Sequence, residues 1–229
     1  MDPDDIRSQL IWSFLKAVEI IQPRAFVMEN VKALAAIAKW KDVREEFIVK
    51  AKEMGYGCIP FIVNAAEYGT PQKRERVFFI GIKGEEEFGD KFLELLYKQK
   101  SKAPTIRELF KDLGPAGTER NPKTCSAKIT YAERPVMRKI PYDCLMFNGI
   151  GRPIDPDGYS RTITASQGGN MTLIVDEEFL HNPNANNWIQ EYYEKLVSHE
   201  VTPKFAEAPE RLRRLTINET RRIQTFPDD

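Results

Sequence analysis

Apolar residues recur at helical spacing near the start of the chain. The pattern has a period close to 3.6 residues and stops before Pro23, which cannot continue a helix. We therefore predict an amphipathic helix over residues 6 to 21 with one apolar stripe. The stripe consists of Ile6, Leu10, Phe14, Val18 and Ile21.

A second helix is predicted over residues 40 to 54, which read WKDVREEFIVKAKEM. Its apolar positions Val43, Phe47, Ala51 and Met54 share one stripe. We expect it to end at Gly55 or Gly57, because glycine readily adopts the left-handed conformation that closes a helix.

Three apolar runs have the character of strands. The run AFVM (residues 25 to 28) is typical of a buried central strand, and it ends on the polar pair Glu29 and Asn30. The runs CIPFIVN (58 to 64) and RVFFIGIK (76 to 83) flank a loop that contains three cations. This order of elements predicts the second half of a Rossmann-like, doubly wound mixed α/β sheet, in which ligands bind at the carboxyl ends of strands. The sequence has no Gly-rich turn between a strand and a helix, the feature that would cradle a nucleotide-like cofactor.

The character of the sequence changes near residue 100, from periodic segments to irregular stretches that contain Pro and Gly. Short strands are predicted at RTITAS (161 to 166) and MTLIV (171 to 175). Thr216 and Glu219 have capping-box spacing and predict a helix that Pro227 would end. We expect three parts: residues 1–100, a smaller irregular β-containing region over 101–210, and residues 211–229 returning to the first part.

Charge is balanced over the whole chain, with 34 basic and 34 acidic side chains, so any anionic partner must be bound by a local patch. Two such excesses occur. Within residues 120 to 140, Glu133 is the only acid beside Arg120, Lys123, Lys128, Arg134, Arg138 and Lys139. In the tail, Glu219 stands among Arg211, Arg213, Arg214, Arg221 and Arg222. Taken alone, each excess predicts either a solvated charged surface or a surface that contacts phosphates.

Cysteine and histidine usage argues against disulfides and metal sites. The three cysteines have no close paired spacing, and the two histidines have no metal-ligand neighbours. The start MDPDDIRSQ has no signal-peptide pattern, and no apolar run approaches the ~18 residues of a membrane span. We expect reduced thiols, no metal, no membrane and a cytoplasmic location, in a prokaryotic cytoplasm or nucleoid.

Several motifs together resemble those of the DNA (cytosine-5) methyltransferases, in the same order. FVMENV (26 to 31) resembles the Glu-Asn-Val motif, and QKRER (72 to 76) the Gln-x-Arg-x-Arg motif. RLTINETRRIQTFP (214 to 227) is similar to the family's Arg-x-Leu-Thr-x-x-Glu segment and its Gln-x-Phe-Pro end. DIRSQL (5 to 10) and PTIRELFKDLGP (104 to 115) are similar to the segments that open a helix and lead into the target-recognition region.

The resemblance also indicates what this chain does not contain. The family's cofactor loop and its Pro-Cys nucleophile loop precede the Asp-x-Arg helix, and a closing Gly-Asn motif follows the Gln-x-Phe-Pro end; none of the three occurs here. We do not assign Cys58, Cys125 or Cys144 as the nucleophile. We expect S-adenosylmethionine as the cofactor, with most of its site outside this chain and Leu10 lining the adenine pocket.

The same resemblance assigns roles to the surviving motif residues. Glu29 would face the cytosine ring nitrogen, because carbon 5 becomes nucleophilic only after a thiolate adds at carbon 6 and that nitrogen gains a proton or a strong hydrogen bond. We expect burial to raise its pKa. Arg76 would stabilise negative charge on the cytosine carbonyl oxygen. Arg74 would order the catalytic loop or hold a phosphate, while Gln72 and Asn30 would order the loops around the site.

Residues 101 to 210 would then contain the region that reads DNA bases. We assign Arg134, Arg138 and Lys139 to phosphates, and Gly168 and Gly169 to a close approach of the backbone to DNA. The overall expectation is part of a restriction-modification cytosine-5 methyltransferase acting on a flipped cytosine in duplex DNA, inactive in isolation. Whether a separate N-terminal segment or subunit is a further partner is left open by the sequence. The alternatives are a non-catalytic DNA-binding module and a transfer-RNA methyltransferase.

Overall fold

The computed structural model describes residues 6–228 of the chain, and the side chains of residues 6–8 are outside this description. The chain forms two compact units. The first comprises residues 1–68 and 74–101, and the second comprises residues 69–73 and 102–229. The predicted α/β class is confirmed.

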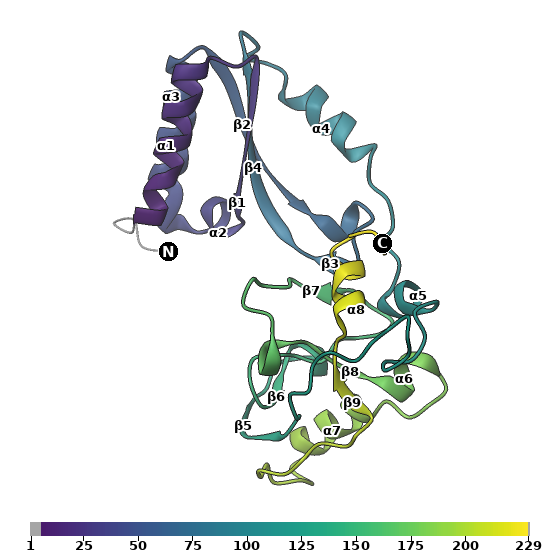
Figure 1. Ribbon diagram of the computed structural model, residues 1–229. Coiled ribbons are helices and arrows are strands. Elements are labelled where there is room, and N and C mark those ends of the chain that lie inside the picture. The colour runs from purple at the N-terminus through teal and green to yellow at the C-terminus, as the bar shows by residue number, and fades with distance from the viewer. Residues whose placement is uncertain (1–5, 229) are drawn as a thin grey trace. The chain divides into compact units, whose positions relative to one another are not determined.

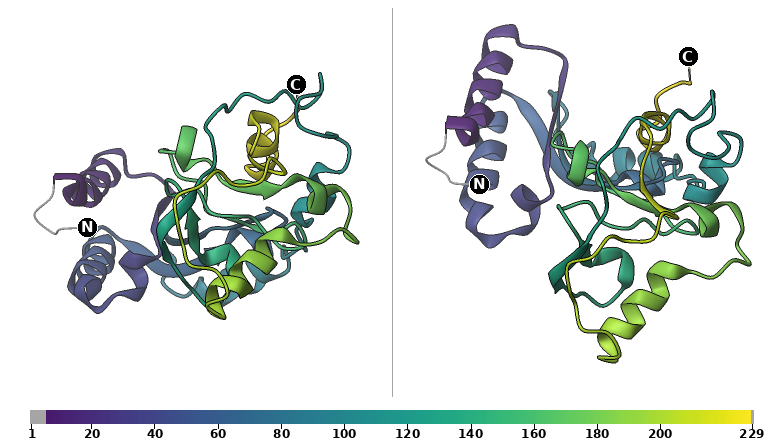
Figure 2. Two further views of the ribbon diagram at one scale, coloured as in Figure 1. Left: turned by 90° about the horizontal axis from the view of Figure 1, so that it is seen from below. Right: turned by 60° about the horizontal axis from the view of Figure 1, so that its bottom comes forward.

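The first unit is a small antiparallel sheet with helices on it (Figure 1). The sheet has the strand order β1-β4-β2, so β4 is central, and among the described strands β1 pairs only with β4. The helices α1 and α3 lie side by side (Figure 2), and α3 packs against β2. The elements are α1 (Ile6–Ile21), β1 (Ala25–Val31), α2 (Ala33–Ala36), α3 (Lys41–Glu53), β2 (Tyr56–Asn64), β4 (Glu75–Lys83) and α4 (Gly89–Tyr97).

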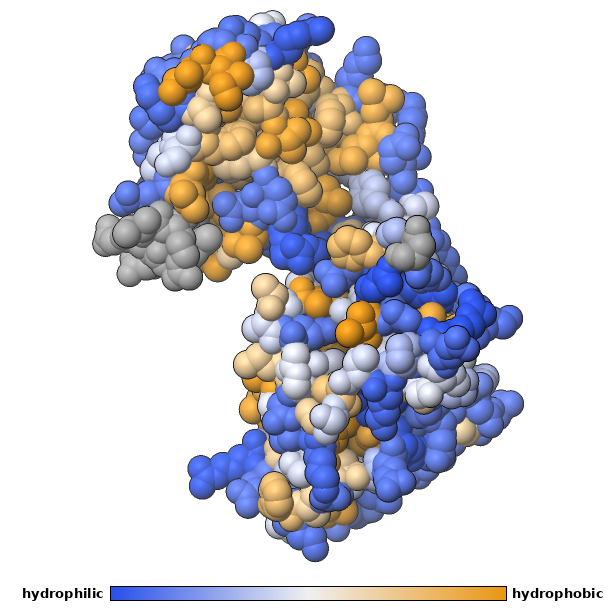
Figure 3. All heavy atoms as spheres, viewed as in Figure 1, coloured by the Kyte–Doolittle hydropathy of each residue, from blue (hydrophilic) through white to orange (hydrophobic). Residues whose placement is uncertain are grey.

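Alternation along the strands divides the sheet into a packed face and an open face. Phe26, Val77 and Phe79 point to the helices and are at most 6% exposed, whereas Val27, which directly precedes Phe79's partner Met28, is 57% exposed on the other face. Figure 3 shows apolar residues gathered on the first unit between helices α1 and α3 at one side of the view and α4 at the other. The prediction that residues 25 to 28 are buried throughout is therefore wrong, because β1 alternates between a covered and an uncovered face.

The predicted helices are both present, and only the stripe of the second is buried as expected. In α3, Phe47 and Ala51 are fully buried. In α1 the buried residues are Ile11, Leu15 and Val18, whereas Leu10 and Ile21 are exposed. The predicted stripe is therefore right in part: Val18 is buried and Phe14 packs against Phe26, whereas Ile11 and Leu15 come from an overlapping stripe that we did not choose. The side chain of Ile6 lies outside the described part.

The second unit is built from short elements around two apolar clusters. Its strands form three two-stranded sheets, β3-β7, β5-β6 and β8-β9. Gln72 and Lys73 belong to this unit because β3 pairs in parallel with Ser160 and Arg161. The elements are β3 (Gln72–Lys73), α5 (Ile106–Phe110), β5 (Tyr131–Val136), β6 (Leu145–Phe147), β7 (Ser160–Arg161), β8 (Ile174–Asp176), α6 (Glu177–His181), α7 (Trp188–Val197), β9 (Leu212–Arg214) and α8 (Ile217–Ile223).

Residues 211–229, which we expected to return to the first part of the chain, cluster within the second unit. The predicted capping box is present: the Thr216 hydroxyl accepts from the backbone N–H of Glu219, and the Glu219 carboxylate accepts from that of Thr216. Helix α8 ends at Ile223, earlier than Pro227, and Thr225 follows in the left-handed region with φ 61°.

Candidate functional site

The sheet register brings Glu29 and Arg76 together. Arg76 lies opposite Val31, and Glu29 lies opposite Phe78, so the two charged side chains are diagonal neighbours on the open face. Their Nε and Oε1 atoms are 3.0 Å apart. Two residues that are 47 positions apart in the sequence thus form one charged pair at the carboxyl end of β1.

The two partners differ in how firmly they are held. The Arg76 side chain is 19% exposed, and its Nη1 also donates to the carbonyl of Glu75 at 2.8 Å. The Glu29 side chain is 45% exposed. The full burial that we expected for Glu29 is therefore absent. The site therefore presents a fixed guanidinium next to a carboxylate that a ligand can reach.

The other motif residues divide between the two units. In the first unit, Asn30 accepts from the backbone N–H of Val31 at 2.8 Å, which orders the turn after Glu29. Arg74 precedes β4, and its carbonyl accepts from the N–H of Ala65 at 2.9 Å. In the second unit, Gln72 is 3% exposed, and its Nε2 has no hydrogen-bond partner among residues 6–228. A buried amide without a partner costs free energy, so this group is a donor available to a ligand or a further segment.

Two remaining positions face solvent. Leu10 is 61% exposed on α1. Lys73 is exposed, and its backbone carbonyl accepts from the Thr162 hydroxyl at 2.9 Å. The loop with three cations is thus heterogeneous: Arg76 is engaged, whereas Lys73 extends outward.

The basic segment over residues 120 to 140 is neutralised in part. Lys128 pairs with Glu207, at 2.6 Å between charged atoms, and Arg120 lies 3.7 Å from Asp112. By contrast, Arg134, Arg138 and Lys139 are exposed and form no ion pair within the described part of the chain. Gly168 and Gly169 are also exposed. These five residues remain predicted DNA contacts.

In contrast to these exposed residues, several arginines of the tail are buried. Arg213 is 5% exposed, and its guanidinium donates to both oxygens of Glu219 at 2.7 and 2.8 Å and to Glu177. Arg211 donates to both oxygens of the buried Asp176 at 2.9 and 3.0 Å. Arg213 and Arg211 are therefore engaged in internal ion pairs, and the buried Arg214 donates to the carbonyls of Thr172 and Asn148, so these three do not form an exposed charged face.

The cysteine thiols are poorly suited to nucleophilic attack where burial acts on them. Burial raises the pKa of Cys58 in β2 to about 12. The pKa of Cys144 is also raised by burial, and its thiol lies 3.2 Å from the carbonyl of Ile140. Cys125 is half-buried, with Sγ 3.7 Å from the carbonyl of Gly169. Among residues 6–228 there is no group of three His, Cys, Asp or Glu side chains placed to hold a metal, and none of the described helices is long and apolar enough to cross a membrane.

One charged cavity was missed by the sequence analysis. It lies in the second unit, has a volume of about 400 Å³ and is lined by Lys73, Arg152 and Arg161 together with Asp143 and Asp155. Burial and the neighbouring Arg161 lower the pKa of Arg152. Arg161 also forms an ion pair with Asp143, so the charges of the cavity are partly balanced from within. No local sequence signal indicates this cavity, since Lys73 lies about 80 residues before Arg152 and Arg161.

Comparison with known proteins identifies the family of this chain. The family model described as C-5 cytosine-specific DNA methylase matches residues 2–229. The type II methyltransferase M.BspRI of Lysinibacillus sphaericus is 27% identical over 98% of this chain and 46% of its own length. M.BsuRI of Bacillus subtilis is also 27% identical, over 98% of this chain and 44% of its own length. The chain therefore spans about half the length of these curated relatives.

Solved structures show the same fold. A prophage-encoded DNA modification methyltransferase of E. coli superposes with a TM-score of 0.55 at 18% identity, covering 98% of this chain and 65% of the other. The Dnmt2 methyltransferase of S. pombe gives a TM-score of 0.54 at 16% identity, covering 96% and 61%.

Proposed function

Because the chain belongs to the C-5 cytosine-specific DNA methylase family, we propose that it forms the catalytic and target-recognition part of a DNA cytosine-5 methyltransferase of a restriction-modification system. The reaction transfers a methyl group from S-adenosylmethionine to carbon 5 of a cytosine in duplex DNA. The names of the curated relatives, which are bacterial type II methyltransferases, favour DNA as the substrate and a bacterial cytoplasm as the location.

The pairing of Glu29 with Arg76 is the observation that carries this proposal. A cytosine rotated out of the duplex presents its ring nitrogen and carbonyl oxygen on one edge, next to each other. A carboxyl and a guanidinium 3.0 Å apart match these two atoms. Glu29 shares its proton or a hydrogen bond with the nitrogen, and Arg76 stabilises negative charge on the oxygen as a thiolate adds to the ring.

The supporting residues take positioning roles. Asn30 holds the backbone after Glu29, and Arg74, which lies just before β4, holds a phosphate or the catalytic loop. The unpartnered Nε2 of Gln72 is suited to donate to that loop. Arg134, Arg138 and Lys139 provide exposed charge for phosphates, while Gly168 and Gly169 leave room for the DNA backbone.

Few residues of this chain are assigned to contact the cofactor. S-adenosylmethionine supplies the methyl group. Leu10 presents an exposed apolar side chain that an adenine ring can cover. No other described residue is assigned to it, and the sequence has no Gly-rich turn that would hold its polar groups.

We further propose that a separate N-terminal segment or subunit carries the nucleophile and most of the cofactor site and pairs with the free edge of β1. An unpaired strand edge is a template for another strand. Exposed apolar side chains flank this edge: Ile20 and Ile21 are each 72% exposed, and Val27 is 57% exposed.

Reconstitution tests the proposal. The part of M.BspRI that this chain does not match is co-expressed with it, and transfer of tritiated methyl groups into duplex DNA is measured. We expect transfer by the pair and none by either part alone. Arg76→Ala should lower the rate roughly 10²–10³-fold, as for the loss of one donor to an oxyanion, whereas Lys73→Ala is the matched control and should have little effect. Equally mild effects of the two substitutions would refute the assigned role of Arg76.

A further inference from the structure

A pocket in the second unit is lined by three aromatic rings to which the sequence analysis assigned no role. Tyr131 comes from β5, and Trp188 and Tyr192 come from α7. The ring centroids of Trp188 and Tyr192 are 5.1 Å apart at 21°, and those of Tyr131 and Tyr192 are 4.7 Å apart at 39°. These rings form a stacked series, in the range of distances at which aromatic pairs attract.

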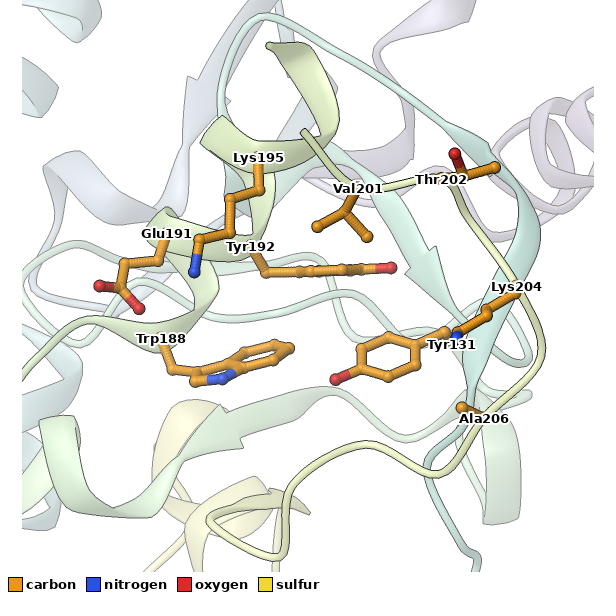
Figure 4. Close-up of a pocket in the computed structure, with 9 residues that line it drawn as sticks. All are labelled: Tyr131, Trp188, Glu191, Tyr192, Lys195, Val201, Thr202, Lys204 and Ala206. Carbon is orange, nitrogen blue, oxygen red and sulfur yellow. The ribbon is translucent and has the colours of Figure 1, made fainter. Parts of the chain in front are cut away.

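The pocket is preformed by main-chain hydrogen bonds. The segment over residues 201 to 206 closes one side, because the N–H of Val201 donates to the carbonyl of Lys195 at 3.2 Å and the N–H of Tyr131 donates to the carbonyl of Ala206 at 2.9 Å. In Figure 4 the Tyr192 ring lies across one side of the Trp188 and Tyr131 rings, with Ala206 next to Tyr131. Tyr192 is buried, whereas Tyr131 and Trp188 are only partly covered, so their surfaces are available to a ligand.

Charge at the rim restricts the class of ligand. Lys195 and Lys204 line the pocket, are exposed, and form no ion pair with any residue that the structure describes. Glu191 is the one carboxylate in the lining. Many exposed lysines elsewhere in the chain are paired, as Lys128 is with Glu207. The pocket therefore combines an aromatic floor with two unpaired ammonium groups, which complements a planar ring attached to an anionic group.

The size of the cavity restricts the ligand further. Its volume is about 220 Å³. A cavity of this size has room for one planar ring.

We propose that this pocket binds a single unstacked base of a nucleic acid strand, with the base stacked against Trp188 and Tyr131 and its phosphate held by Lys195 and Lys204. Base–aromatic stacking of this kind tolerates any base sequence. The site is distinct from the pair formed by Glu29 and Arg76, which lies in the other unit. The inference rests on the proposed function only in taking nucleic acid as the partner.

Titration of the full chain with deoxyguanosine monophosphate tests the pocket directly. The chain has three tryptophans, Trp12, Trp40 and Trp188, whose indole N–H signals can be followed by NMR. We expect the Trp188 signal to shift while the other two do not, and ribose 5-phosphate, which has no base, to leave all three unchanged. An unmoved Trp188 signal, or an equal shift with ribose 5-phosphate, would overturn the proposal.

Variants separate stacking from charge. Trp188→Leu keeps apolar packing and should weaken nucleotide binding roughly 5- to 150-fold, measured by saturation transfer to the base protons. Tyr97→Leu, at an exposed aromatic residue of the first unit, is the matched control and should change nothing. Lys195→Gln and Lys204→Gln, both at exposed positions, should each weaken binding of the nucleotide roughly 1.5- to 5-fold and leave binding of deoxyguanosine, which has no phosphate, unchanged. Equal effects on both ligands would contradict the assigned role of the lysines.

A last arm distinguishes a strand from a free nucleotide. A duplex with one unpaired base should bind more tightly than the same duplex with an abasic site at that position, and Trp188→Leu should remove the difference. Equal affinities would refute a strand as the ligand. None of these measurements requires methyl transfer, so a failed reconstitution leaves their outcome readable, and binding of the fully paired duplex reports on the proposed function separately.

Discussion

Removal of the Glu219 carboxylate should destabilise the second unit severely. This side chain is 1% exposed and accepts four hydrogen bonds: two from Arg213 at 2.7 and 2.8 Å, one from Asn121 at 3.1 Å and one from the backbone of Thr216 at 3.0 Å. Glu219→Gln keeps the volume but removes the charge. Arg213, itself 4% exposed, would then retain only Glu177 as an ionic partner.

The expected size of the effect follows from this burial. Breaking a buried ion pair by removing one partner costs about 3–5 kcal/mol, because the remaining charge stays in a medium of low polarity. The free energy of unfolding of a whole domain is typically about 5–15 kcal/mol. Glu219→Gln should therefore lower the midpoint of urea unfolding of the second unit by about a fifth of its value or more. Replacement of both partners, Arg213→Met with Glu219→Met, should restore much of the loss.

The assay is urea unfolding followed by the indole N–H signals in NMR. Trp188 reports on the second unit, while Trp12 and Trp40 report on the first and serve as an internal control. We expect the Trp188 transition to move to lower urea in Glu219→Gln and the other two to stay. A loss below about 1 kcal/mol, or a double variant no more stable than the single one, would show that the pair is not the buried ionic contact described above.

Three further outcomes are expected. In the reconstituted enzyme, Glu29→Gln should lower turnover roughly 10²–10⁴-fold while duplex binding survives, and a parallel loss of binding would assign Glu29 to structure instead. Charge reversal at Arg134 and Arg138 should reduce the slope of log duplex affinity against log salt concentration by about 0.9 per lost phosphate contact. An unchanged slope would show that neither residue contacts a phosphate. Burial raises the pKa of Cys58 to about 12, so its thiol stays protonated at every pH well below that value. Alkylation of Cys58 at pH about 8 should therefore be far slower than alkylation of an unhindered thiol, whose pKa is ≈ 8.5. Rapid labelling of Cys58 in the folded chain would contradict this.

The sequence predicts those elements whose local pattern allows only one buried face or one cap. The stripe of α3 was predictable because Phe47 and Ala51 have no competing apolar face. The capping box at Thr216 depends only on residues three positions apart. In α1, by contrast, apolar residues occupy more than one face, and the sequence alone does not say which face meets the sheet.

For the candidate site, the sequence predicts which motif residues belong to it but not how they pair. The motif positions of Glu29 and Arg76 indicated two site residues, but their pairing depends on the register of β1 against β4. The tail arginines were misread because their carboxylate partners, such as Asp176 and Glu177, are more than thirty residues away. Helix α7 was also missed, although Asn187 caps it and Ile189, Tyr192 and Leu196 are buried at helical spacing.

The strand β3 gives the chain an unusual connectivity with a practical consequence for engineering. Gln72 and Lys73 are part of the second unit, yet they are embedded in the sequence of the first. The polypeptide therefore passes between the units three times, near residues 68, 73 and 101. A chimera that exchanges only residues 102–229 with a homologue of different specificity would leave the recipient's own β3 beside a foreign β7. We expect such grafts to succeed more often when the five residues 69–73 are exchanged together with the module to which they belong.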